Sequence, residues 1–187
     1  IHRSVMLIYK FLGGLLYVFV LAVVLIGGSW LALSVRSGYW NPAYLASIGV
    51  LTLYFAILYS VSALFGVLWR SWIGSVLMTI LAWALFKAVN FGYLQVHDPE
   101  NLGEIPARWV TMMDGVHFIL PKTSELSILN QLLLVKSHLG ETMDEAMVRE
   151  AANLPSAITW GMTISTSIGF IVVLLGLACW RFSRKDY

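Results

Sequence analysis

The sequence predicts an all-α protein, a polytopic membrane helix bundle with a short extracytoplasmic helical segment. Hydrophobic residues make up 59% of the chain and charged residues 12%, whereas a soluble domain carries about a quarter charged residues. Four long runs are nearly free of ionisable side chains, and each is long enough to cross a hydrocarbon core of roughly 30 Å as a helix. Nine of the ten acidic residues lie between Asp98 and Glu150, so one polar segment interrupts the apolar runs.

The last apolar run fixes the orientation of the chain. Residues 157–180 contain no Asp, Glu, Lys, Arg or His, and as a helix they are about 36 Å long. The cations Arg181, Arg184 and Lys185 follow directly. A basic tail beside an apolar span is held on the cytoplasmic side of the membrane. Residues 156–187 are therefore expected to form the last transmembrane helix and a basic cytoplasmic tail.

The first half of the chain, residues 1–94, is expected to contain three transmembrane helices. Residues 1–10 carry Arg3 and Lys10 among apolar residues and are expected to form an interfacial segment that leads into the membrane. The chain begins with Ile1 rather than Met and shows no signal peptide, so we expect further residues upstream. The spans are expected at about residues 11–35, 45–68 and 71–93.

Residues 95–155 are expected to form an extracytoplasmic helical loop. Leu126, Leu129 and Leu133 recur at helical spacing. Thr142 and Glu145 match the capping box of a second helix, in which each side chain bonds a free backbone N–H group. We expect two short helices on or near the outer membrane surface.

The distribution of cations agrees with this topology. With the C-terminus inside, alternation of four spans places residues 1–10 and Arg70 in the cytoplasm, and Arg36 and residues 95–155 outside. Cations are thus concentrated at the cytoplasmic ends, as the positive-inside rule requires. The same rule accounts for the basic net charge, so we expect no nucleic-acid partner.

Signatures of catalysis are absent from the sequence. It contains no Walker glycine-rich loop, no Gly-x-Ser-x-Gly elbow and no His-Glu-x-x-His pair, and no span contains a pair of carboxylates. The single cysteine, Cys179, excludes an intrachain disulfide. We expect no catalytic residues, no ATP site and no cofactor in this chain.

The acidic segment contains one candidate metal site. Its oxygen and imidazole groups are of the kinds that bind a divalent ion, but their spacing has no fixed Cys/His framework. A solvated acidic loop with ordinary histidines explains them better, so we predict no metal site. The residues concerned are His97, Asp98, Glu100, Asp114 and His117.

Lys87 is the one charged residue inside a predicted span. An intramembrane charge indicates a functional site by default, which here means a transport pathway. Lys87 nevertheless lies near the outer end of its span, where a lysine side chain can extend to the headgroups. Both interpretations remain open, and extension to the headgroups is favoured.

Small residues recur on two of the spans. Gly161, Ser165 and Gly169 repeat every four residues on the last span, a pattern that permits close approach of a neighbouring helix. The neighbour is either another span of the same chain or a second copy. The same alternatives apply to Ser60, Ser62 and Gly66 of the second span, and paired glycines at 13–14 and 27–28 indicate close contacts of the first.

Four stretches of the chain together form a pattern. The opening residues 3–14 carry Arg3 and Lys10 ahead of the glycine pair at 13–14, and a Ser-rich second span (59–66) ends in the basic turn at Arg70. The outer segment includes Phe118–Pro121, and the final helix ends in the Arg181–Asp186 tail. These stretches resemble the permease subunits of type-2 ATP-binding-cassette exporters, in which residues 3–14 would correspond to the entry to the third span. The resemblance covers nearly all of the chain, which would correspond to the last four of six spans.

The resemblance implies a function. The chain would be a permease subunit without enzyme activity that moves a substrate across a membrane by alternating access. ATP and Mg would bind a separate ATPase subunit, and a second permease copy would complete the transporter, with a homodimer expected. A multi-pass protein of the prokaryotic cytoplasmic (inner) membrane is implied. The residues expected to couple to the ATPase, by location, are Arg3, Lys10, Arg70, Arg181, Arg184 and Lys185.

Two other functions remain open at this point. A membrane-embedded enzyme with its site in the outer loop would act on a lipid or periplasmic substrate without nucleotide. A non-transporting anchor or assembly subunit would have stable partners but no ATP-dependent flux.

Overall fold

The protein is all-α in the part of the chain that the structure describes, as the sequence predicts. The computed structural model describes residues 3–38, 40–69, 71–96, 106–121, 123–127, 130 and 160–184. No strand occurs among them, and four of the helices are long and apolar enough to cross a membrane. The elements are α1 (Arg3–Ser37), the 3-10 helix η1 (Pro42–Leu45), α2 (Ala46–Trp69), α3 (Trp72–Val96), α4 (Ala107–Ile119) and α7 (Trp160–Arg184).

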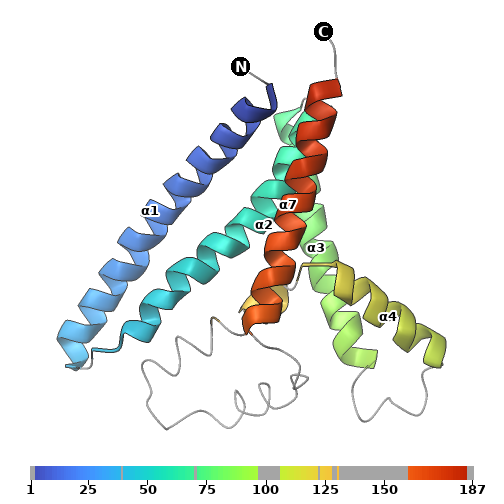
Figure 1. Ribbon diagram of the computed structural model, residues 1–187. Coiled ribbons are helices and arrows are strands. Elements are labelled where there is room, and N and C mark those ends of the chain that lie inside the picture. Colours follow the sequence, from blue (N-terminus) through green and yellow to red (C-terminus); the bar gives the residue numbers. More distant parts are fainter. Residues whose placement is uncertain are drawn as a thin grey trace.

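The first helix is longer than the sequence suggests. We expected an interfacial segment over residues 1–10 and a span from residue 11, but α1 is continuous from Arg3 and therefore includes Lys10. Its 35 residues measure about 52 Å, so α1 must tilt or project from a hydrocarbon core of roughly 30 Å. Figure 1 shows α1 steeply inclined to α7.

Polar contacts fix the connection between α1 and α2. Gly38 has a φ of 72°, a conformation that glycine adopts without steric cost, and its N–H donates to the carbonyl of Ser34 at 2.9 Å. Trp30 Nε1 donates to the carbonyl of Asn41 at 2.9 Å, and its ring meets Trp40 edge-on, with centroids 5.4 Å apart. These contacts tie Trp40 and Asn41 of the connection to the end of α1.

The four spans form one bundle around α2. Helix α2 contacts α1, α3 and α7, and the N- and C-terminal ends of the chain lie at the same end of the bundle (Figure 1). The turn between α2 and α3 lies at that end too, whereas the α1–α2 connection lies at the other (Figure 1). This arrangement has the alternation of spans that the cation distribution requires.

Small residues bring α2 against α3 and α1. Ser75 of α3 donates its hydroxyl to the carbonyl of Ser62 at 2.6 Å, and the two Oγ atoms are 2.8 Å apart. A Cβ at Gly66 would meet Ser75 Oγ at 3.7 Å. On the other side of α2, the ring of Tyr59 lies so close to Gly14 that a Cβ there would come within 2.8 Å of the phenol oxygen. The small residues of α2 thus serve packing within the chain.

The core is narrow and the outer surface of the bundle is apolar. Ile57, Val61, Phe86 and Leu126 form the buried cluster. Large apolar side chains such as Leu16, Val24, Leu77, Leu81 and Val172 are more than half exposed. Contiguous apolar surface of this kind is unusual in a soluble monomer but suits contact with lipid. The protein is therefore a multi-pass membrane protein.

Candidate functional site

The chain returns into the bundle after α4. Helix α4, which the sequence analysis did not anticipate, packs against α3, and Met113 lies over Gly92. Leu120 then adopts an extended backbone and Pro121 is buried. Residues 123–127 are helical. In Figure 1 the chain passes from α4 toward the base of α7 at this point. Residues 120–121 and 123–127 are called the inserted segment below.

Four consecutive side chains of the inserted segment are buried. The exposed fractions are 2% for Thr123, 6% for Ser124, 5% for Glu125 and 0% for Leu126. Leu126 belongs to the buried core with Ile57 and the other members of that cluster. The other three are polar, and burial of polar groups is unfavourable unless they find partners. The inserted segment is therefore held in the bundle by specific contacts and not by apolar packing alone.

A hydrogen bond links the inserted segment to the last span. Thr163 of α7, fully buried, donates its hydroxyl to Glu125 Oε2 at 3.0 Å. One turn later on α7, Ser167 donates to the carbonyl of Thr163 at 2.7 Å. Loss of a hydrogen bond to a buried carboxyl group is costly, because the group keeps its desolvation penalty. Glu125 thus fixes the inserted segment to α7.

Further polar groups surround this link. Tyr93 near the end of α3 lies within electrostatic reach of both Asp114 and Glu125. The Ser124 hydroxyl is buried without a hydrogen-bond partner among the described residues. It borders a cavity of about 10 Å³, which Asn90 also lines, close to the least volume that holds one water. We refer to Tyr93, Asp114, Ser124, Glu125 and Thr163 as the polar cluster.

The polar cluster joins α3, α4, the inserted segment and α7. Its chemistry is that of one buried carboxyl group among hydroxyls, with a second carboxylate, Asp114, on α4. Carboxyl and hydroxyl groups in this arrangement can hold a proton or a water and can lock helices together. Within the described ranges, no group of three or more His, Cys, Asp or Glu residues is placed to hold a metal ion.

Four of the six cationic residues predicted from the sequence belong to the described part of the chain, and these four lie toward one end of the bundle. Arg3 and Arg184 are the first residue of α1 and the last residue of α7, and the two ends lie together in Figure 1. Arg181 is exposed on α7, and Lys10 lines a groove between α1, α2 and α3. Arg70 and Lys185 lie outside the described residues, so their placement is not described.

The small-residue stripe on α7 does not contact another described helix. A Cβ built at Gly161 or Gly169 would meet no atom within 4 Å, and Ser165 is exposed. The face of α7 that packs inside the bundle instead carries Phe170 and Leu174, among others. The neighbour considered for the stripe was either another span of the same chain or a second copy. The described part of the chain supplies no such span.

Two other predicted features can be placed in part. Lys87 is exposed on α3, directly after Phe86 of the buried core. Of the acidic and histidine residues weighed as metal ligands, Asp114 is exposed on α4 and the side chain of His117 is not described. His97, Asp98 and Glu100 lie outside the described residues, as do the predicted helix cap at Thr142 and Glu145.

Sequence reasoning missed Glu125. It is one of nine acidic residues in a segment whose composition predicts a solvated loop, and its neighbours distinguish it only weakly from the other eight. One weak signal existed, because Glu125 directly precedes Leu126, the first apolar residue of the predicted outer helix. On the last span, Thr163 and Ser167 are four residues apart, the spacing of one helix face, and the small-residue pattern of Gly161, Ser165 and Gly169 beside them obscures this signal.

Comparisons with known proteins add no relative to this description. No protein-family model matches the chain, and no curated protein or solved structure is significantly similar to it.

Proposed function

We propose that this chain is the transmembrane permease subunit of an ATP-driven exporter of the type-2 ATP-binding-cassette class. A separate ATPase subunit binds ATP and Mg, and two permease copies form the transport unit. The observation that carries the proposal concerns Phe118–Pro121, one of the four stretches on which the resemblance rests. This stretch lies where the chain leaves α4 and enters the bundle, and Pro121 is buried there.

The geometry suits a protein that moves helices. Leu126 of the inserted segment packs with α2 and α3 through Ile57 and Phe86, while Glu125 is bonded to Thr163 of α7. A change in the angle between α2 and α7 must therefore move the inserted segment or break the bond at its base. Packed elements with two discrete arrangements are what alternating access requires.

The ATPase would act on the end of the bundle that lies opposite the inserted segment. The ends of α1 and α7 lie together there (Figure 1) and carry Arg3, Arg181 and Arg184. In the proposed mechanism, ATP binding closes the ATPase pair and pushes these helix ends. The free energy that shifts the population between the inward- and outward-facing states then cannot exceed the difference in the free energy with which the ATPase binds the two states.

Co-purification and flux test the proposal. The full-length chain is expressed with any ATP-binding-cassette ATPase that is encoded beside it, purified, and reconstituted into vesicles. We expect a complex with two copies of each subunit and ATP hydrolysis that stops when the Walker lysine of the ATPase is replaced. A complex that contains a single permease-like chain would contradict the proposed pair of permease copies. If the ATPase does not co-purify and no ATP-dependent flux is found, the chain is an anchor or an enzyme instead.

A further inference from the structure

A groove opens between α1, α2 and α3 near the end of the bundle that carries the two termini. It has a volume of about 490 Å³. Its walls combine one cation, Lys10, with the hydroxyls of Ser71 and Ser75 and the phenol of Tyr59. The remaining wall is mostly apolar and includes Leu7, Phe11, Ala63, Val67, Trp72 and Val76.

Lys10 lies in the membrane-spanning part of α1. The Tyr59 hydroxyl donates to the Lys10 carbonyl at 3.5 Å, and the Tyr59 ring stacks on Phe11 with centroids 4.9 Å apart. Tyr59 lies about 15 Å along α2 from its end at Trp69, at 1.5 Å per residue. The backbone of Lys10 is therefore below the headgroup level, and its side chain extends back toward the N-terminal end of α1.

The charge of Lys10 is not balanced within the described part of the chain. Two carboxylates are described, Asp114 and Glu125, and both lie with α4 and the inserted segment, near the opposite end of α3 from the groove (Figure 1). A cation below the headgroup level is unfavourable unless an anion or water reaches it. The groove offers a path by which such an anion enters.

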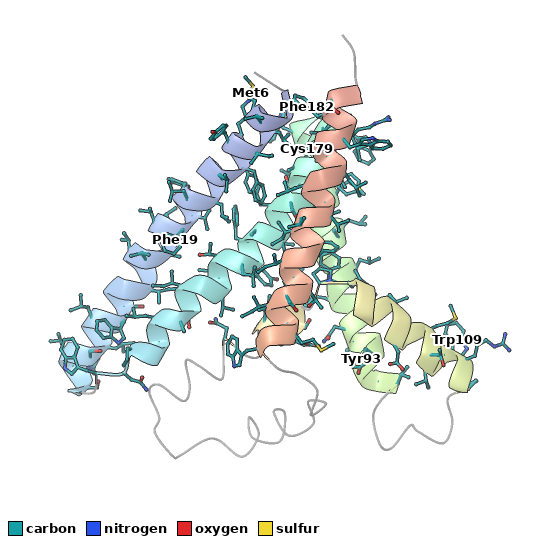
Figure 2. The ribbon with its side chains drawn as sticks, viewed as in Figure 1. Met6, Phe19, Tyr93, Trp109, Cys179 and Phe182 are labelled. Atoms are coloured by element: carbon teal, nitrogen blue, oxygen red, sulfur yellow. The ribbon has the colours of Figure 1, made fainter. Side chains whose placement is uncertain are left out.

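Ser71 and Trp72 place the mouth of the groove at the membrane interface. Ser71 Oγ accepts a hydrogen bond from the Gly74 N–H at 3.3 Å, which leaves the Ser71 O–H to donate. Trp72 is 78% exposed, as is typical of tryptophans at the headgroup level. Figure 2 shows Met6 of α1 and Phe182 of α7 at the same end of the bundle, the end that carries the two termini.

We propose that this groove binds one anionic phospholipid. Its phosphate lies between the Lys10 ammonium and the Ser71 hydroxyl, and one acyl chain runs along the wall formed by Phe11, Ala63 and Gly66. Basic pockets between membrane helices bind anionic headgroups in this way. The site does not depend on ATP-driven export, and it would exist in a membrane enzyme or an anchor equally.

Lipid retention tests the site. The full-length chain is purified in detergent and incubated with phosphatidylglycerol, phosphatidylcholine or inorganic phosphate, and native mass spectrometry measures the bound lipid. One lysine at the surface favours anionic lipid by about five-fold, so wild type should retain phosphatidylglycerol over phosphatidylcholine by about that factor. Equal retention of the two lipids would overturn the proposal. So would displacement of phosphatidylglycerol by inorganic phosphate at equal concentration, because the site would then hold a free anion.

Variants test the binding of the lipid headgroup and the binding of the acyl chain separately. Lys10→Gln should abolish the preference and Lys10→Arg should keep it, while Arg36→Gln, at the other end of α1, should leave it unchanged. Gly66→Leu should lower retention of both lipids, since a Cβ there fits at 3.7 Å from Ser75 Oγ and the added groups fill the groove. A preference that survives Lys10→Gln, or is lost equally in Arg36→Gln, contradicts the site. Unchanged retention in Gly66→Leu contradicts the placement of the acyl chain.

Discussion

The role of the Glu125 side chain can be recognised only from the fold. In the sequence it is one acid among nine in a polar segment, but in the structure its side chain is 5% exposed and bonded to Thr163. Buried ionisable groups in membrane proteins mark functional sites more often than stability. Hydropathy treats all nine acidic residues alike, and it therefore could not predict that Glu125 is buried.

The first prediction concerns the bond between Thr163 and Glu125. Thr163→Val keeps the shape of the side chain but leaves the Glu125 carboxyl without this donor. We expect a loss of about 1–3 kcal/mol in the free energy of unfolding, measured by thermal unfolding in detergent. Thr166→Val is the matched control, because Thr166 bonds only carbonyls of its own helix in the described structure. Equal losses in both variants would show that the link to the inserted segment contributes nothing.

At the scale of elements, the spans were predictable and the inserted segment was not. Runs without charge predict membrane helices because the bilayer excludes unpaired polar groups, and α2 (Ala46–Trp69) matches the expected residues 45–68 closely. Helix α4 was missed because Arg108 and Asp114 interrupt its apolar residues, and its hydrophobic pattern is weak. Entry of a polar segment into the bundle depends on partners from distant parts of the chain, which hydropathy does not contain.

The second prediction tests whether the inserted segment is anchored by Leu126. Leu126 is fully buried, with Ile57 and Phe86 among its neighbours in the core. Leu126→Ala should leave a cavity and lower the free energy of unfolding by about 2–4 kcal/mol. Leu177→Ala removes the same atoms from a side chain of α7 that is 46% exposed and should cost much less. If thermal unfolding in detergent shows the two variants to be equally stable, the inserted segment is not part of the core.

At the scale of the whole molecule, the third prediction concerns its orientation. Ser37 and Ser183 are exposed and lie near opposite ends of the bundle, at the ends of α1 and α7. In a Cys179→Ala background, an impermeant thiol reagent added to intact cells should label Ser37→Cys and not Ser183→Cys. The physical reason is that the basic tail is held in the cytoplasm. Labelling of Ser183→Cys alone would show that the topology is the inverse of the one expected. The ATPase and the anionic lipid would then be expected on the other side of the membrane.

The last prediction concerns the assembly of two copies through α7. Gly161, Ser165 and Gly169 form a stripe of small residues on a face of α7 that meets no described neighbour. Lipid provides no hydrophobic force for helix association, so close packing at small residues is the main source of attraction between spans. Gly169→Leu adds bulk where the chain itself has room, and we expect it to weaken dimerisation while leaving the thermal stability of the monomer unchanged.

A neighbouring substitution supplies the control. Ile168 is 49% exposed and points about 100° away from Gly169 around the helix, so Ile168→Leu at conserved volume should leave dimerisation intact. Both variants place a leucine on the surface of α7, and the comparison therefore isolates the position from general hydrophobicity. Dimer fractions measured by cross-linking in vesicles should separate the two. If Gly169→Leu dimerises as well as Ile168→Leu and wild type do, the stripe faces lipid, and the second copy must contact another surface of the bundle.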